Sequence, residues 1–358
     1  MRDEPDWMVM RAGRGRNWGG EIRRARIFQR LAERTDATVV DGWPAVQAAV
    51  RGRFWQPWRR LRPRRPMLAA SEGASPAWLD RIDRLTVPVA VAIYDDIVAQ
   101  SRALGLPLTA EREAELRLRR TRNERAFRWH VVPTRAFAEA FGLDLDRIIV
   151  GRQGTVTEHV VPGPWPDRPA VGIVSGASPG RGIESLIAAM QLVRETVRDV
   201  TLYLWLSATS SRDEAYADEL RTASAGSPWI QIATAPYADL GPTLAKASVL
   251  TIPHPAVEYM DVILPVKLFD SLAAGRPLVV TPRTETVAIV EPNQVGLVTA
   301  DDRPESIAAA ILRLLEDQDL ARSMGTRARE LAVREFDWGV LGDRIADEIL
   351  RREGLAIH

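Results

Sequence analysis

Short apolar runs alternate with helical patterns along the second half of this chain, and this alternation limits the possible folds more than any other feature. Runs of strand length occupy 170–176, 200–206, 229–235, 248–254, 277–282 and 296–300. Stretches with apolar residues at helical spacing lie between most of them. Strands that alternate with helices form a parallel sheet with right-handed crossovers. The first half shows the same alternation, so the sequence predicts one α/β architecture used twice.

A proline-rich segment separates the two halves. Residues 160–169 contain four prolines and one glycine, a composition that neither a helix nor a central strand accepts. A chain of 358 residues is long enough for two domains. We therefore expect an N-terminal domain at 1–165, a second domain at 166–338 and a C-terminal helix at 339–358.

The two halves differ in charge. Residues 1–165 carry 29 arginines against 20 acidic residues, whereas the remainder carries 19 basic and 27 acidic residues. This asymmetry indicates that the two domains have different partners, with the basic half suited to an anionic surface or a phosphorylated acceptor.

Composition excludes several classes of site. The chain has no cysteine, which rules out disulfides, thiolate catalysis and cysteine-held zinc. Its first residues, MRDEPDWMVM, lack the apolar core of a signal peptide. No apolar stretch approaches the ~18 residues that a membrane-spanning helix needs. We expect a cytoplasmic protein.

The segment Pro253–Pro277 combines a helix signal with charged residues. Pro265 is suited to a first helical turn, and Gly275 followed by Pro277 is typical of a helix end. The apolar run at 248–254 precedes this helix. The residues between the run and the helix therefore lie at the carboxyl end of a strand, where open α/β sheets bind ligands.

Three charged residues in that segment are candidate ligand contacts: Glu258, Asp261 and Lys267. The chain has only two lysines, Lys246 and Lys267, because nearly every other cation is an arginine. A lysine offers a compact point charge. Lys267 is therefore interpreted either as a phosphate contact or as a solvated lysine without a role.

A glycine-rich loop follows the run at 170–176. Gly176, Gly180 and Gly182 permit a close approach of the backbone to a ligand. Arg181 lies at the start of the next helix, where the helix dipole already favours an anion. The pattern predicts a bound phosphate, and the alternative is a surface carboxylate that pairs with Arg181.

The first half offers weaker candidates. A loop with Arg16, Gly19 and Gly20 follows the run at 7–12 and either contacts a phosphate or only makes a turn. Asp95 and Asp96 follow another run, where they either face an acceptor or cap a helix.

Arg51–Arg65 contains seven arginines together with Phe54, Trp55 and Trp58, and no acid. This composition fits an anionic membrane surface, a nucleic acid, or a solvated loop whose aromatic residues pack on the domain.

Three motifs resemble a known family. SGASPGRGIESLIAAM from Ser175, PVKLFDSLAAGRPLVV from Pro265 and REFDW from Arg334 are similar to motifs of retaining GT-B glycosyltransferases of the group 1, family 4-like type. The resemblance covers residues 170–340. It implies two Rossmann-like domains that face each other across a cleft, with the C-terminal helix crossing back to the first domain.

The resemblance also implies roles for individual residues. Arg181 and Lys267 would hold the diphosphate of a nucleotide-sugar donor, and Asp270 would accept hydrogen bonds from the ribose. The family often has another acid eight positions before Asp270, where this chain has Val262. Asp261 and Glu258 are the acids nearest to that position.

These observations predict a glycosyltransferase that moves a sugar to a glycan or lipid-linked acceptor, with retention, at the inner face of the cell membrane. Preorganised cations stabilise the charge that develops on a leaving nucleoside diphosphate. No cofactor, metal or nucleic-acid partner is expected. The alternatives are a catalytically weak scaffold of the same fold, a dehydrogenase, which the missing GxGxxG pattern disfavours, and a nucleic-acid binder.

Overall fold

The protein consists of two compact units in the computed structural model. The structure describes residues 96–354, the backbone of strands at 7–12, 38–41, 65–71 and 89–92, and residues 27, 29–31, 33 and 34. The first unit combines Met1–Val98, Leu108–Arg152 and Trp338–His358, and the second combines Ala99–Pro107 and Gln153–Asp337. The proline-rich segment 160–169 therefore belongs to the second unit.

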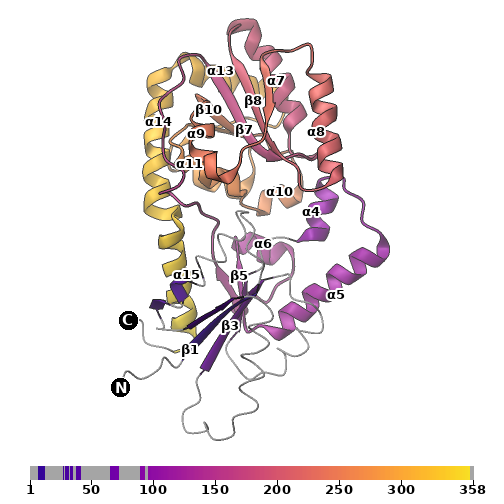
Figure 1. Ribbon diagram of the computed structural model, residues 1–358, viewed down its shortest axis with the longest axis vertical. Coiled ribbons are helices and arrows are strands. Elements are labelled where there is room, and N and C mark those ends of the chain that lie inside the picture. The colour runs from indigo at the N-terminus through magenta and orange to yellow at the C-terminus, as the bar shows by residue number, and fades with distance from the viewer. Residues whose placement is uncertain are drawn as a thin grey trace, which may run out of the picture. The chain divides into compact units, whose positions relative to one another are not determined.

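The first unit is built on a parallel sheet of six strands (Figure 1). The strand order is β2 (Thr38–Asp41), β1 (Trp7–Ala12), β3 (Arg65–Ser71), β4 (Val89–Ala92), β5 (Trp129–Val132) and β6 (Ile148–Val150). Helices α5 (Ala110–Ala126), α6 (Arg135–Ala140) and α15 (Trp338–Arg352) belong to the same unit.

The last helix, α15, packs on the first sheet. Its Ile345 lies so close to Gly151 that a Cβ at this glycine would be 2.8 Å from the Ile345 side chain. Glu353, which follows the helix, accepts a hydrogen bond from the Trp129 indole at 2.6 Å. The final segment of the chain thus returns to the unit in which the chain began.

The second unit is built on another parallel sheet of six strands. The order is β12 (Gly296–Val298), β11 (Leu278–Val280), β10 (Val249–Ile252), β7 (Ala170–Gly176), β8 (Thr201–Ser207) and β9 (Ile230–Ala233). Read from β9, this is the 3-2-1-4-5-6 order of a dinucleotide-binding sheet, and the order reverses between β7 and β10. The predicted parallel α/β fold class is confirmed.

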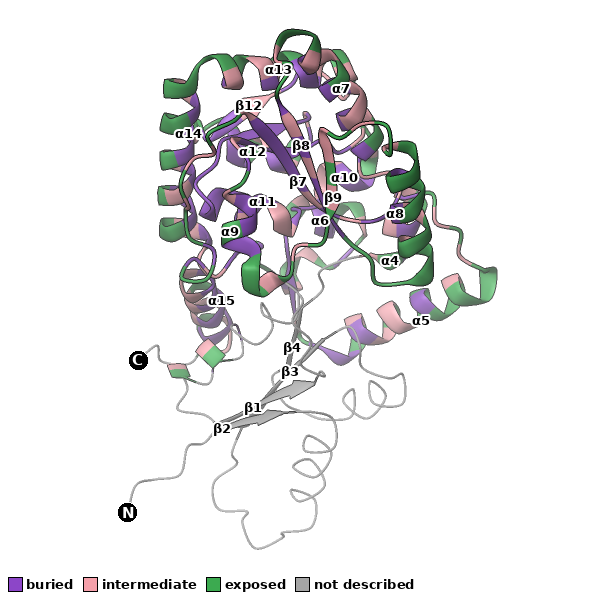
Figure 2. Ribbon diagram, turned by 45° about the horizontal axis from the view of Figure 1, so that its top comes forward, coloured by how far each residue is buried: buried purple, intermediate pink, exposed green. Residues whose placement is uncertain are grey.

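Helices cover both faces of the second sheet (Figure 2). On one face α7 (Ile183–Thr196), α8 (Ser211–Ala223) and α13 (Pro304–Glu316) bury their apolar side chains against the strands. On the other, α9 (Leu240–Leu244), α11 (Val266–Ala273) and α12 (Thr284–Val290) do the same. Helix α14 (Gln318–Leu331) contributes buried side chains to both cores. Strands buried on both faces explain why their sequences are continuous apolar runs.

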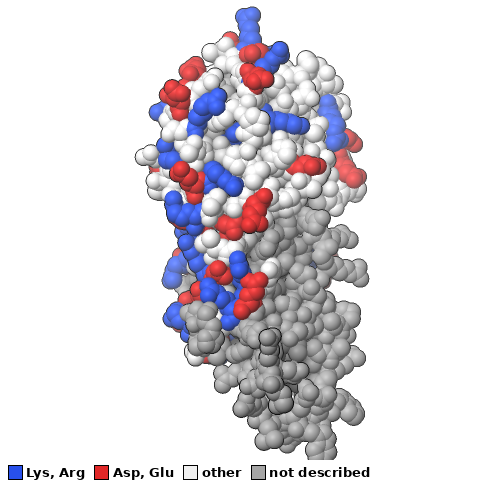
Figure 3. Space-filling view, turned by 60° about the vertical axis from the view of Figure 1, so that its left-hand side comes forward, with Lys and Arg blue, Asp and Glu red and all other residues white. Residues whose placement is uncertain are grey.

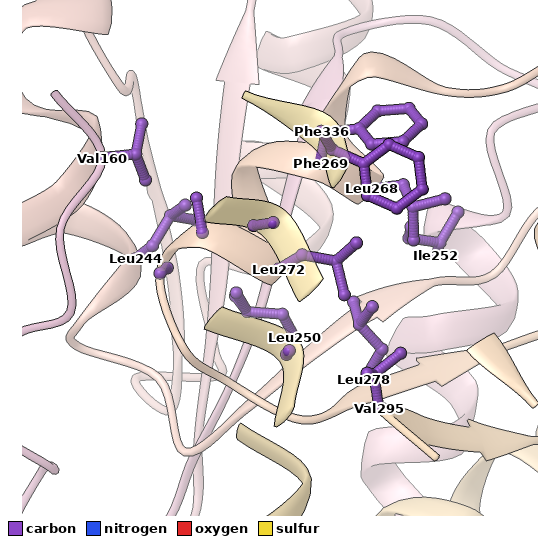
Figure 4. Close-up of a cluster of buried hydrophobic side chains, with 14 of the residues drawn as sticks. Val160, Leu244, Leu250, Ile252, Leu268, Phe269, Leu272, Leu278, Val295 and Phe336 are labelled. Atoms are coloured by element: carbon purple, nitrogen blue, oxygen red, sulfur yellow. The ribbon is translucent and has the colours of Figure 1, made fainter. Parts of the chain in front are cut away.

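Helix α11 forms where the sequence predicts a helix. Pro265 is its N-cap, and Gly275 follows its end with a left-handed φ of 66°. Leu268, Phe269 and Leu272 point into the core shown in Figure 4. The ring of Phe269 packs against Phe336 with a centroid distance of 4.9 Å, which joins α11 to the segment before α15.

The described surface carries both signs of charge. On the face shown in Figure 3, arginine and acidic side chains are interspersed over the second unit. None of the helices in the described part of the chain is long and apolar enough to cross a membrane.

Candidate functional site

The candidate site lies where the strand order of the second sheet reverses. Strands β7 and β10 are neighbours, but α7 follows β7 onto one face and α11 follows β10 onto the other. Connections that diverge in this way leave room between the carboxyl ends of the two strands, which is where open α/β sheets bind ligands. The β7–α7 loop and the segment from β10 to α11 border this place.

Glycines bring these two segments together. Gly182 caps α7 with a φ of 77°, and a Cβ there would lie 1.7 Å from the carbonyl oxygen of Pro253. Gly180 has a φ of 72° and a Cβ there would lie 3.0 Å from the carbonyl oxygen of Ala103, in the second unit. A Cβ at Gly176 would meet nothing within 4 Å in the described part of the chain. Gly182 and Gly180 therefore shape the loop, whereas Gly176 faces open space.

The structure brings the two predicted cations, Arg181 and Lys267, into one neighbourhood. The Nε of Arg181 lies 3.5 Å from the hydroxyl of Ser178 on the same loop. The Nζ of Lys267, in the first turn of α11, lies 3.5 Å from the hydroxyl of Ser175 at the end of β7. The charge of Arg181 contributes to lowering the pKa of Lys267, as expected for two cations that lie close together.

The environment of Lys267 favours an anion. Burial, with a further contribution from Arg181, lowers the pKa of Lys267 from 10.5 to about 7. Within residues 96–354, Lys267 contacts a neutral serine hydroxyl and no carboxylate pairs with it. An anion bound beside Lys267 would restore its charged form.

A histidine that the sequence analysis did not single out completes this cluster. His254 follows β10 and is fully buried. Neither ring nitrogen has a hydrogen-bond partner in the described part of the chain. Burial and the charges of Lys267, Arg181 and Arg283 lower the pKa of His254 well below its ordinary value, so its ring is neutral.

The predicted acids Asp261 and Glu258 lie in other surroundings. Asp261 accepts a hydrogen bond from the backbone N–H of Thr284 at 3.2 Å and lies 3.5 Å from the guanidinium of Arg283. It thus contacts the start of α12. Glu258 is exposed in the first turn of α10 (Glu258–Val262).

Asp270 lies one helical turn beyond Lys267 on α11. Its Oδ1 accepts a hydrogen bond from the Thr155 hydroxyl at 2.7 Å. Burial raises the pKa of Asp270 to about 6, although Thr155 and His159 act in the opposite direction. The backbone N–H of Thr155 donates to the carbonyl of Phe336 at 2.9 Å, so the partner of Asp270 is itself held in place.

The candidates in the first half are only partly visible. Arg16, Gly19, Gly20 and Asp95 lie outside the described residues, as does Arg51–Arg65 except for the backbone of its last residue. Asp96 precedes α4 (Ile97–Ala103) and its carboxylate pairs with Arg120 at 2.7 Å. No group of three or more histidines and acids that could hold a metal occurs among the residues that were placed.

Several known proteins resemble this chain. Residues 168–317 match the family model described as Glycosyl transferases group 1. The chain is 28% identical over 190 residues to a GDP-mannose-dependent alpha-(1-6)-phosphatidylinositol monomannoside mannosyltransferase of Mycobacterium tuberculosis, a match that covers 51% of this chain and 47% of the relative. The chain thus spans about half the length of the curated relatives it matches.

Solved structures resemble the whole described fold. HepE of Anabaena in complex with UDP-glucose has a TM-score of 0.70 at 16% identity, over 96% of this chain and 99% of that one. A glycosyltransferase from Rickettsia africae has a TM-score of 0.65 at 14% identity with the same coverage. These likenesses show that the chain has the GT-B fold with two Rossmann-like domains, as the resemblance in the sequence implied.

Proposed function

We propose that the chain, which is similar to group 1 glycosyltransferases, transfers a sugar from a nucleoside diphosphate sugar to a glycan or lipid-linked acceptor. The observation that carries the proposal is the position of Lys267 and Arg181. They lie at the strand reversal of the second sheet, and Lys267 has no carboxylate partner among the residues that the structure describes.

The geometry supports a definite role for these side chains. As the glycosidic bond of the donor breaks, negative charge grows on the leaving diphosphate. Lys267 and Arg181, together with the N-terminus of α7, would stabilise that charge without having to reorganise. Asp270, one turn beyond Lys267, would accept hydrogen bonds from the ribose. We further propose that the anomeric configuration is retained and that no metal ion takes part.

The donor base is open to direct test. The mycobacterial relative is named for GDP-mannose, whereas the Anabaena neighbour was solved with UDP-glucose. Thermal unfolding with UDP, GDP, ADP and dTDP identifies the base, because a ligand that binds only the folded state raises its melting temperature. If none of the four nucleotides raises the melting temperature of the wild-type protein, the proposed function is wrong.

Transfer itself separates an enzyme from a catalytically weak scaffold. The scaffold alternative is favoured by Val262, which stands where the family often has an acid, and by Asp261, which contacts Thr284 and Arg283. Sugars attached to the nucleotide that binds best should be transferred or hydrolysed by the wild-type protein. Binding without any turnover across the donor panel would favour the scaffold.

We also propose that the protein works at an anionic membrane surface on the cytoplasmic side. The support is the composition of Arg51–Arg65 and a relative named for a phosphatidylinositol acceptor. Sedimentation with vesicles that contain phosphatidylserine should carry the protein down, and neutral vesicles should not. The proposed membrane association is wrong if the protein sediments with neither kind of vesicle and if replacing the arginines of Arg51–Arg65 leaves activity on lipid acceptors intact.

A further inference from the structure

The backbone at His254 is fixed from two sides. The carbonyl oxygen of Pro253 lies 1.7 Å from the position that a Cβ of Gly182 would take, so the chain here is pressed against the start of α7. The carbonyl oxygen of His254 accepts a hydrogen bond from the Thr281 hydroxyl at 2.6 Å, just beyond β11. The backbone that carries the imidazole is therefore held between the start of α7 and the segment that follows β11.

The imidazole itself makes no hydrogen bond within the described part of the chain. It is fully buried, and both ring nitrogens are shielded from solvent. Buried polar side chains in native proteins nearly always have partners, so a ring with two unpaired nitrogens needs an explanation. An apolar side chain of the same volume would fill this place without that cost.

The neighbours of His254 supply the explanation. The charges that act on its ring come from Lys267, Arg181 and Arg283, with Lys267 contributing most. Because the ring is neutral, one nitrogen donates a hydrogen bond and the other accepts one. Ammonium and guanidinium groups only donate hydrogen bonds, so such a cation is a chemically suitable partner for the accepting nitrogen.

We propose that His254 is a positioning residue for Lys267: in the nucleotide complex its accepting nitrogen takes a hydrogen bond from the Lys267 ammonium and directs it at the diphosphate. This inference rests on the proposed function, because it assigns a partner to a cation that the donor is proposed to use. Within the described residues, the polar contact that Lys267 makes is to the Ser175 hydroxyl at 3.5 Å, which is too long to orient it well.

A neutral imidazole suits this task better than an acid. A carboxylate at residue 254 would hold Lys267 more strongly, but it would cancel the charge of the lysine and repel the phosphates. A neutral acceptor orients the ammonium and leaves its charge available to the ligand. The chain does place a carboxylate, Asp261, beside Arg283.

The test compares three substitutions at His254. His254→Leu removes both nitrogens, His254→Asn keeps an amide near the position of Nδ1, and His254→Gln keeps one near Nε2. Affinity is measured by calorimetry for the nucleoside diphosphate that wild type binds best and for the matching monophosphate. His130→Leu is the control, because His130 is a buried histidine of the first unit with an unpaired Nδ1.

The inference predicts a selective loss. His254→Leu should weaken diphosphate binding about 10- to 100-fold, as expected for a hydrogen bond to a charged group, and it should weaken monophosphate binding less. Either the asparagine or the glutamine variant should restore affinity to within a few fold. In a Lys267→Ala background the same leucine substitution should have almost no effect, because the residue through which it acts is gone.

Three results would overturn the inference. One is diphosphate affinity in His254→Leu equal to that of His130→Leu and wild type. Another is an equal loss for diphosphate and monophosphate. The third is an undiminished effect in the Lys267→Ala background. If wild type itself binds none of the nucleotides, the proposed function fails first and the inference fails with it.

Discussion

Two cations of the second unit, the buried Arg276 and the half-buried Lys267, have opposite surroundings. Arg276 is 1% exposed, and its guanidinium donates to the carbonyl oxygens of Ala247 at 2.8 Å, Pro164 at 2.6 Å, and Gly163 and Ala245 at 3.1 Å. Its guanidinium carbon also lies 4.7 Å from the centroid of the Trp165 ring. Among the residues that the structure describes, Lys267 has one serine hydroxyl at 3.5 Å.

The difference distinguishes Arg276, a cation that stabilises the fold, from Lys267, a cation that we propose binds a ligand. The planar fork of an arginine can satisfy several carbonyls at once, so Arg276 fastens the proline-rich segment to the end of α9 and to α11. A lysine is a point charge with a pKa that burial shifts readily, and here the pKa is lowered to about 7. Backbone carbonyls of the protein pair with Arg276, whereas we propose that the diphosphate of the substrate pairs with Lys267.

The largest expected effect on stability comes from Arg276. Arg276→Ala removes the buried donor to four backbone carbonyls, and we expect the free energy of unfolding to fall by about 3 kcal/mol or more. Chemical denaturation measures the loss. Arg276→Lys should recover only part of it, because an ammonium cannot match the fork. Equal stability of the alanine variant and wild type would remove the contrast with Lys267.

Lys267 should behave in the opposite way. Lys267→Met should lower transfer or nucleotide-sugar hydrolysis by about 10²-fold or more, the size expected when a stabilising charge is removed from a transition state. It should not lower stability. The pKa of Lys267 is lower in the folded than in the unfolded state, so its charge destabilises the fold up to about pH 7, and the penalty disappears as the pH rises toward 10.5.

Thermal unfolding at two pH values checks this sign. The methionine variant should melt at a higher temperature than wild type at pH 6.5, and the difference should shrink at pH 9.5. A variant that melts below wild type at pH 6.5 would mean that Lys267 holds the fold as Arg276 does.

Nucleotide binding should take up a proton above neutral pH. A bound diphosphate raises the pKa of Lys267 from about 7, so affinity should be highest below pH 7 and should fall by up to tenfold per pH unit above it. Calorimetry in buffers of different ionisation enthalpy measures the uptake. Lys267→Arg, which stays charged, is the control and should lose most of this dependence.

The smallest effect on stability is expected at Gly176. A Cβ there would meet no atom of the described residues within 4 Å, so Gly176→Ala should change the free energy of unfolding by no more than about 1 kcal/mol. Nucleotide affinity should nevertheless fall, because the methyl group would occupy space next to Ser175. Gly182→Ala is the contrasting variant, and it should be strongly destabilised by the contact with Pro253.

The sequence predicted those parts of the site that local chemistry fixes. Pro265 and Gly275 define α11, and the glycines around Arg181 define the β7–α7 loop. The sequence therefore predicts that Arg181 and Lys267 each follow the carboxyl end of a strand. In a parallel sheet those ends share one edge, which is why the neighbourhood of Arg181 and Lys267 could be expected before the strand order was known.

The parts that the sequence did not reveal depend on which strands are neighbours. His254 is a single histidine after a strand, and no local pattern says that Lys267, Arg181 and Arg283 surround it. Arg276 belongs to a Gly-Arg-Pro helix end, but its acceptors come from residues 163–164 and 245–247. Asp261 was a predicted donor contact, and its hydrogen bond to Thr284 depends on the pairing of β10 with β11.

The most direct measurement is calorimetric titration of the four nucleoside diphosphates into wild type and into an Arg181→Ala, Lys267→Ala double variant. We predict that wild type binds at least one of them and that the double variant, melting at or above the wild-type temperature at pH 6.5, binds it at least 100-fold more weakly. Equal affinity in the two proteins would contradict the claim that these cations are kept for a diphosphate.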